Sequence, residues 1–131
     1  MIFIVGGMGQ GKAEFAQEQF PELKHEILSD GESASWEEFM GASFGMNLQA
    51  MIRRRLENGE TSEALERGMA QELLKACPER VILADEIGCG IVPVDTFSRS
   101  YREVTGRICC QLARESKEVW RVVAGIGQRI K

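Results

Sequence analysis

The sequence contains a single histidine, His25, and this scarcity excludes a histidine-rich metal site. It also has no apolar run that approaches the roughly 20 residues of a membrane-spanning helix. The apolar start, residues 1–5, stops at Gly6 and carries no positive charge ahead of it, so a signal peptide is not expected.

The sequence also lacks an excess of basic residues, and it lacks a paired-cysteine motif. The 16 lysines and arginines are outnumbered by 20 acids, and the resulting net charge of −4 argues against binding to nucleic acid or to an anionic membrane. Four cysteines occur without a CxxC pair, which favours free thiols in a reducing cytoplasm: Cys77, Cys89, Cys109 and Cys110. We therefore expect one cytoplasmic domain, residues 1–131, with no nucleic-acid or membrane partner.

Short apolar segments alternate along the chain with amphipathic ones. Strands are predicted at residues 1–5, 26–30, 80–86 and 118–124. Helices are predicted at residues 13–20, 35–57, 62–77 and 96–115. We expect Gly41 and Gly45 to interrupt the second helix, Ser62 to cap the third, and Gly125 and Gly127 to close the last strand. The alternation predicts an α/β fold with a mainly parallel sheet.

Residues 6–12, which we call the glycine loop, satisfy the pattern GxxxxGK between a predicted strand and a predicted helix. Glycines allow backbone N–H groups to surround phosphate oxygens, and the helix N-terminus adds partial positive charge. Lys12 is expected to reach the β- and γ-phosphates of ATP or GTP. The residues predicted to bind this nucleotide are Gly6, Gly7, Met8, Gly9, Gln10, Gly11, Lys12 and Ala13. The alternative is a glycine-rich turn with an incidental lysine.

Ala13 stands where this pattern usually has serine or threonine, whose hydroxyl helps to hold Mg²⁺. Water or acids must then hold the metal, and Asp85 and Asp30, each at the end of a predicted strand, are the candidates. Glu86 could polarise a nucleophile, so Lys12, Asp85 and Glu86 are the predicted catalytic residues. For Asp85 and Asp30 the alternative is a carboxylate that only caps a turn.

Arginines form two groups on predicted helices. The run of residues 53–55 is expected to face solvent, whereas Arg99, Arg102 and Arg107 either stabilise a transferring phosphoryl group or pair with surface acids. Two tryptophans are expected in the core and the histidine at the surface: Trp36, Trp120 and His25.

Residues 85–93 read Asp-Glu-Ile-Gly-Cys-Gly-Ile-Val-Pro. They resemble the (N)E-x-G-x-G-I-V-P segment of the bifunctional adenosylcobinamide kinase / adenosylcobinamide-phosphate guanylyltransferase family, the CobU/CobP type. Residues 118–126 are similar to its EVWLVVSGI ending, and the glycine loop is similar to its GGxxSGK start. The likeness also includes Arg99, Tyr101, Arg102, Gly106, Arg107, Leu112 and Ala113. It covers roughly the first 15 and the last 50 residues.

This resemblance implies a P-loop NTPase-like three-layer fold, here reduced in size, and a homotrimer. Members of the family phosphorylate the hydroxyl of adenosylcobinamide in cobalamin biosynthesis, and then transfer GMP from GTP through a histidine-bound intermediate. The implied ligands are therefore a nucleotide with Mg²⁺ and adenosylcobinamide or another corrinoid.

The middle of the chain departs from the family pattern. Nothing matches the family's histidine-rich segment, and residues 26–30 look like a later strand, so we infer a deletion between Phe20 and Glu26. We expect GMP transfer to be lost with that histidine. Cys109 and Cys110 replace Asn-Gln, and Ala13 replaces serine. The leading hypothesis is a corrinoid-alcohol kinase. The alternatives are a non-catalytic nucleotide- or corrinoid-binding partner or regulator, and a kinase for an unrelated alcohol.

Overall fold

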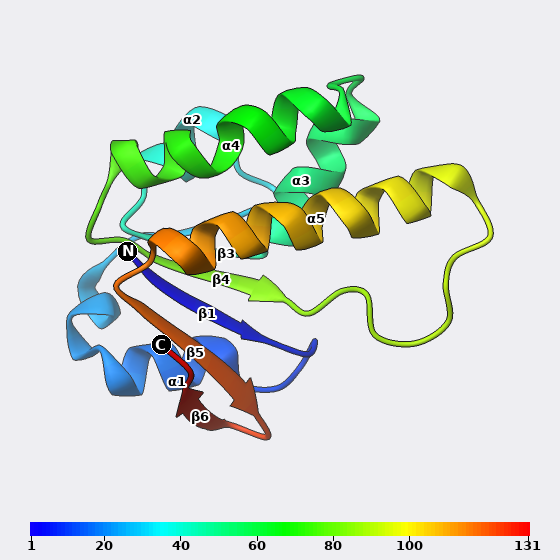
Figure 1. Cartoon of the computed structure of the whole chain (residues 1–131). Coiled ribbons are helices and arrows are strands. Elements are labelled where there is room, and N and C mark those ends of the chain that lie inside the picture. The colour runs from blue at the N-terminus through cyan, green and yellow to red at the C-terminus, as the bar shows by residue number, and fades with distance from the viewer.

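A computed structural model describes the whole chain, residues 1–131, as a six-stranded sheet between two layers of helices (Figure 1). The strands are β1 (Ile2–Gly6), β2 (Leu28–Asp30), β3 (Phe44–Met46), β4 (Val81–Asp85), β5 (Glu118–Val123) and β6 (Ile126–Arg129). Their order across the sheet is β2-β3-β4-β1-β5-β6, and only β6 runs antiparallel to its neighbour. The predicted α/β, P-loop NTPase-like fold with a mainly parallel sheet is confirmed.

Helices cover both faces of this sheet. One face carries α1 (Lys12–Gln19) and the 3₁₀ helix η1 (Pro21–His25). The other carries α2 (Trp36–Gly41), α3 (Leu48–Glu57), α4 (Ser62–Ala76) and α5 (Thr96–Glu115) (Figure 1). None of these helices combines the length and apolar character that crossing a membrane requires.

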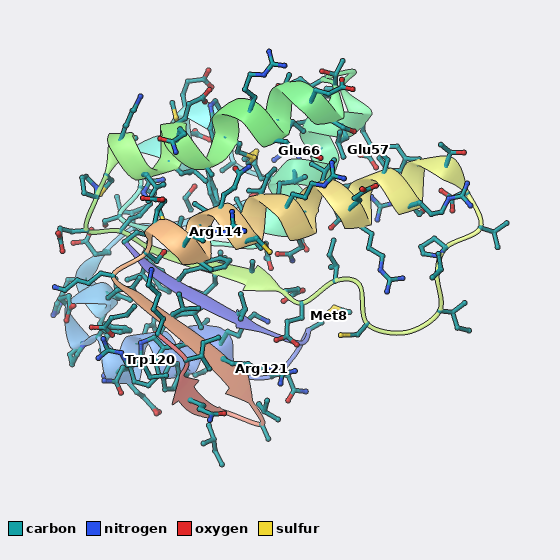
Figure 2. The ribbon with its side chains drawn as sticks, viewed as in Figure 1. Met8, Glu57, Glu66, Arg114, Trp120 and Arg121 are labelled. Carbon is teal, nitrogen blue, oxygen red and sulfur yellow. The ribbon has the colours of Figure 1, made fainter.

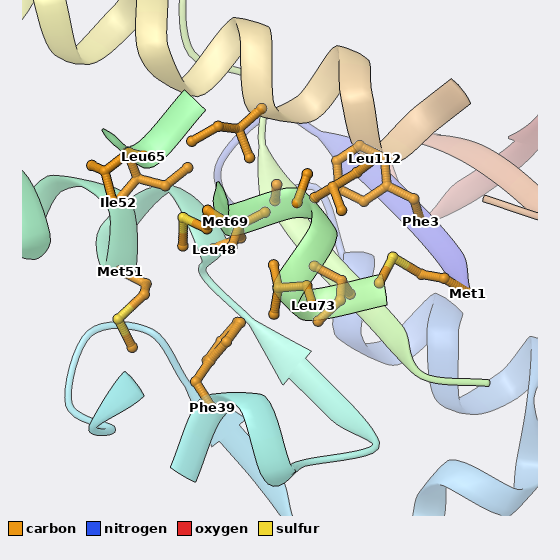
Figure 3. Packing of buried hydrophobic residues seen from close by; sticks show 14 of the residues in the cluster. Met1, Phe3, Phe39, Leu48, Met51, Ile52, Leu65, Met69, Leu73 and Leu112 are labelled. Carbon is orange, nitrogen blue, oxygen red and sulfur yellow. The ribbon is translucent and has the colours of Figure 1, made fainter. Parts of the chain in front are cut away.

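The apolar strands supply two cores because successive residues of a strand point to opposite faces of the sheet. Phe3 and Ile82 belong to the larger core beneath α2–α5, whereas Ile4 and Leu83 belong to the smaller core beneath α1 and η1. Figure 3 shows how the larger core draws on helices and on β1 together. Burial on both faces explains why β1 and β4 read as continuous apolar runs.

Strand β3 is a correction to the sequence prediction, which placed residues 35–57 in one interrupted helix. A Cβ at Gly45 would lie 2.9 Å from the Phe39 ring and 3.0 Å from the Ile82 side chain. The glycine that weakened the predicted helix therefore lets α2 pack closely on a strand. Gly45 was therefore a valid signal in the sequence, but it marked the strand β3 and not a kink within one helix.

Strand β6 is a second correction, because the sequence prediction makes residues 118–124 the last strand, closed by Gly125 and Gly127, whereas Gly127 lies within β6. Ala124 (φ 51°) and Gly125 (φ 75°) both adopt left-handed backbone, which suits a two-residue hairpin turn. The chain consequently reverses after β5 and pairs with it as β6. Gly127 lies against the ring of Phe15.

The structure also corrects the predicted cap of α4 and the predicted burial of the two tryptophans. Thr61, not Ser62, caps α4 by accepting a hydrogen bond from the Ala64 amide. Trp36 and Trp120 are half-buried and not fully inside the core, because each indole N–H donates to a carboxylate near the surface: Glu72 and Glu118. The prediction that His25 is exposed is confirmed.

Arg80, just before β4, is fully buried although it is charged. Its guanidinium donates to the Met40 carbonyl near the C-terminal end of α2, and burial lowers its pKa. The contact joins α2 to the strand whose far end carries Asp85.

Cys109 and Cys110 are neighbours on α5 but differ in exposure. Cys109 packs against the larger core, and burial raises the pKa of its thiol to about 12, whereas Cys110 is exposed. Because the thiolate is the reactive form, Cys109 is expected to react with iodoacetamide at pH 8 at least about 100-fold more slowly than Cys110. Tandem mass spectrometry after timed labelling measures both rates, and equal rates would contradict the prediction.

Candidate functional site

The glycine loop begins where the central strand ends. Gly6 is the last residue of β1, and the parallel register pairs it with Asp85, the last residue of β4. The carboxyl end of β1 also lies where the strand order reverses, between β4 and β5. In open α/β sheets this position forms a crevice suited to a ligand.

The loop is fixed in part by the β5–β6 hairpin. The Gln10 side-chain oxygen accepts a hydrogen bond from the Ala124 amide at 2.7 Å, and the Gln10 carbonyl accepts one from the Gly125 amide at 2.8 Å. Gly9 and Gly11 have φ values of 71° and 79°, which favour glycine. The tight turn after β5 therefore shapes the loop after β1.

A cavity of about 290 Å³ adjoins the glycine loop. Six of the eight residues predicted to bind nucleotide line it, namely residues 8–13, and Asp85 lines it too. Gly6 and Gly7 contribute differently, because their carbonyls accept hydrogen bonds from Lys12. Met8, at the tip of the loop, is 84% exposed (Figure 2).

Lys12 and Asp85 form an ion pair inside this cavity. The Lys12 Nζ lies 2.5 Å from the Asp85 Oδ1, and it also donates to the carbonyls of Gly7 at 2.8 Å and Gly6 at 3.1 Å. Both side chains are largely shielded, at 10% and 17% exposure. An anion that enters the cavity must therefore compete with Asp85 for the lysine.

Two amide side chains that sequence reasoning missed complete the arrangement around Asp85. The Gln49 Nε2 donates to the Asp85 Oδ2 at 3.0 Å, and the Asp85 amide donates to the Gln49 Oε1 at 2.9 Å. Asn47, in left-handed backbone between β3 and α3, accepts from Gln49 at 3.3 Å and donates to Asp30 at 3.0 Å. A polar Gln49 within the apolar run Leu48–Ile52 was the available signal.

Asp30 and Asp85 therefore occupy different places. The Asp30 Oδ1 accepts hydrogen bonds from the Glu32 amide and from Asn47, which matches the alternative of a carboxylate that caps a turn. Asp30 does not line the cavity at the glycine loop. It lines a separate cavity of about 740 Å³, together with His25. The geometry favours Asp85 over Asp30 as an acid for a metal near the loop.

The donor set suits Mg²⁺ only when it arrives with a nucleotide. No group of three or more histidine, cysteine, aspartate or glutamate side chains is placed to hold a metal ion. Mg²⁺ in nucleotide sites needs one or two carboxylates, because phosphates and water supply its other oxygens. The Asp85 carboxylate meets that requirement, and Ala13 adds no oxygen to it.

Glu86 is not brought to this cavity. Its two oxygens accept hydrogen bonds from the Arg121 Nε at 2.7 Å and the Arg121 Nη2 at 3.0 Å, on β5 (Figure 2). This bidentate contact raises the pKa of Arg121. The predicted role of Glu86 in polarising a nucleophile needs this ion pair to open.

Two arginines of α5, Arg102 and Arg107, have partners away from the glycine loop, and Arg99 is exposed. Arg107 pairs with Glu66 at 2.9 Å, the surface alternative raised by the sequence. Arg102 donates to the carbonyls of Gly88 and Ile91 and so supports the loop between β4 and α5.

Arg54 corrects the prediction that residues 53–55 face solvent together. Its guanidinium donates to the Gly31 carbonyl at 3.0 Å and to the Ala34 carbonyl at 2.7 Å. The Arg55 Cζ lies 4.4 Å from the centroid of the Trp36 ring, and the Arg55 guanidinium pairs with Glu60. These two side chains hold the turn between β2 and α2, a role that a charge run does not reveal.

Comparisons with known proteins show which family and which proteins the sequence is similar to. Residues 42–130 match the family model described as cobinamide kinase / cobinamide phosphate guanyltransferase. The chain is 46% identical over 65 residues to the bifunctional adenosylcobalamin biosynthesis protein CobU of Escherichia coli. It is 40% identical over 75 residues to the protein of the same name from Salmonella typhimurium.

These matches are partial. They cover 47% and 52% of this chain but only 36% and 41% of the two relatives, so the chain spans less than half of either in the match. The family match includes Asn47, Gln49 and Asp85 and begins after the glycine loop. The assignment of the loop therefore depends on its motif and on its geometry.

Proposed function

The chain belongs to the cobinamide kinase / cobinamide phosphate guanyltransferase family, and from this premise we propose that it binds ATP or GTP at the glycine loop and phosphorylates a corrinoid alcohol such as adenosylcobinamide. One observation carries the proposal. Lys12 and Asp85, which are 73 residues apart, meet in one cavity beside the glycine loop at the carboxyl edge of the sheet. A phosphate-binding cation and a metal-binding acid at that edge are what nucleotide phosphoryl transfer requires.

In this proposal the loop amides and the N-terminus of α1 surround the phosphates. The Lys12 ammonium group leaves Asp85 and donates to the terminal phosphates, so that its positive charge neutralises phosphate charge. Mg²⁺ bound with the nucleotide would neutralise phosphate charge, and Asp85 is the carboxylate that would hold it. Ala13 contributes only its backbone amide.

We further propose that this chain does not transfer GMP. A histidine-bound intermediate needs a nucleophile within reach of the nucleotide. His25, the single histidine, lines the larger cavity and not the one that contains Lys12. Incubation with labelled GTP should leave no covalent label on the protein, and a label on His25 would contradict this expectation.

A second candidate function is nucleotide binding without turnover, as a partner or regulator. The ion pair between Glu86 and Arg121 favours it, because it leaves the glycine-loop cavity without Glu86 as a polarising acid. The absence of a hydroxyl at Ala13 favours it too.

Calorimetric titration with GTP and with ATP, each in Mg²⁺ and in EDTA, tests the proposal, followed by a product assay with adenosylcobinamide. Saturable binding with phosphorylated cobinamide supports the kinase. Binding with no product supports the second candidate, and no binding of either nucleotide contradicts both.

A further inference from the structure

Both oxygens of the Asp85 carboxylate have partners, and the two partners differ in kind. Oδ1 faces the charged Lys12 side chain, whereas Oδ2 accepts from the neutral amide of Gln49. The same Gln49 side chain also accepts from the Asp85 backbone amide. Gln49 therefore holds this residue at two points, one on the side chain and one on the backbone.

The amide of Gln49 is buried for these contacts. Only 7% of the residue is exposed, within the apolar turn of α3 that also buries Leu48, Met51 and Ile52. An amide in such a place is unfavourable unless its donors and acceptor are satisfied. Here they are satisfied by Asp85 and by Asn47.

We propose that Gln49 is a positioning residue that fixes the Asp85 carboxylate, so that Oδ1 is presented to the Mg²⁺ of a bound nucleotide. The inference rests on the proposed function, because it concerns what happens to Asp85 once Lys12 moves to a phosphate. At that moment Oδ1 loses its ion pair, and the hydrogen bond from Gln49 to Oδ2 keeps the carboxylate from rotating.

Fixing the Asp85 carboxylate matters here because Ala13 has no side-chain oxygen that could help to hold the metal. Where a hydroxyl is present beside the lysine, it shares the task of holding the metal with the acid. Without that oxygen the geometry of one carboxylate decides how well the metal is held. Fixing that carboxylate in advance removes the cost of ordering it when the metal nucleotide binds.

The variant Gln49→Met separates this role from packing, since methionine fills a similar volume and makes neither hydrogen bond. GTP affinity is measured by calorimetry in Mg²⁺ and in EDTA, together with the melting temperature. We expect the ratio of the two affinities to fall about tenfold, while the affinity in EDTA stays within about threefold of wild type. Asp85→Asn defines the full loss of the Mg²⁺ effect.

The matched control is Gln111→Met, because Gln111 is also a partly buried glutamine that donates a hydrogen bond, here to the Glu66 carbonyl on α4. It should leave the affinity ratio unchanged. Should Gln49→Met fail to fold, Gln49→Leu, which is apolar like its buried neighbours on α3 and makes neither hydrogen bond, is expected to show the same fall in the ratio.

The outcomes distinguish the two proposals. A wild-type protein that binds no nucleotide contradicts the proposed function and this inference with it. Nucleotide binding without any Mg²⁺ enhancement, an unchanged ratio in the Gln49 variants, or an equal loss in Mg²⁺ and in EDTA overturns the role of Gln49 alone.

Discussion

Replacing Lys12 with methionine is expected to weaken GTP and ATP binding by about 100-fold, or close to 3 kcal/mol. The lysine is the one cation that contacts both the glycine loop and Asp85 in the cavity. Methionine keeps most of the apolar stem but removes the charge, and it leaves the negative charge of Asp85 near the phosphates without a nearby cation, although Gln49 still donates to Oδ2. The loss therefore combines a missing attraction with a new repulsion. Calorimetry with each nucleotide measures it.

Lys24→Met is the control for this variant, because Lys24 is an exposed lysine on η1 that lines neither cavity. It removes the same charge from the chain and should leave affinity unchanged. A Lys12→Met protein that folds and binds nucleotide within about threefold of wild type would contradict the assignment of the loop.

Replacing Gly31 with alanine is expected to lower the free energy of unfolding by about 3 kcal/mol or more. A Cβ at this position would lie 2.1 Å from the Asn47 carbonyl oxygen and 2.9 Å from its carbonyl carbon. Both are backbone atoms next to β3, and the Gly31 amide already donates to the Met46 carbonyl at 2.9 Å. The clash can be relieved only by moving the end of β2 away from β3. The same movement would disturb the contact between Asp30 and Asn47.

The matched control is Gly106→Ala, the same substitution inside α5, where no atom beyond the adjoining helix backbone lies within 4 Å of the added Cβ. It should raise stability by about 0.5–1 kcal/mol, because glycine in a helix is costly. Urea unfolding of both variants measures the two opposite changes. A Gly31→Ala protein as stable as wild type would contradict the close approach of these strands.

The glycine loop and the scaffold around it could be read from the sequence because their signals are local. Strand β1, the loop and Lys12 are contiguous, and the apolar run of β4 ends at Asp85. The bounds of α5 follow from its own periodicity and from the cap at Asp95. Each of these features is specified by residues within a few positions of one another.

The rest of the site was decided by contacts that no local pattern encodes. Gln49 contacts Asp85, 36 residues away in the sequence, and fixes the orientation of its carboxylate. Arg121 contacts Glu86, 35 residues away, and holds it outside the cavity. Strands β3 and β6 are short, and they exist because Gly45 permits the approach of Phe39 and because Ala124 and Gly125 form a tight turn.

The sequence by itself determined the class of fold, the phosphate-binding motif and the family resemblance, since strand and helix periodicity, glycine spacing and motif order are properties of neighbouring residues. Only the tertiary structure decided that Asp85 and not Asp30 shares a cavity with Lys12, and that Glu86 lies on Arg121. The physical reason is that side-chain partners are chosen by strand order and register, which place residues far apart in the chain at hydrogen-bond distance.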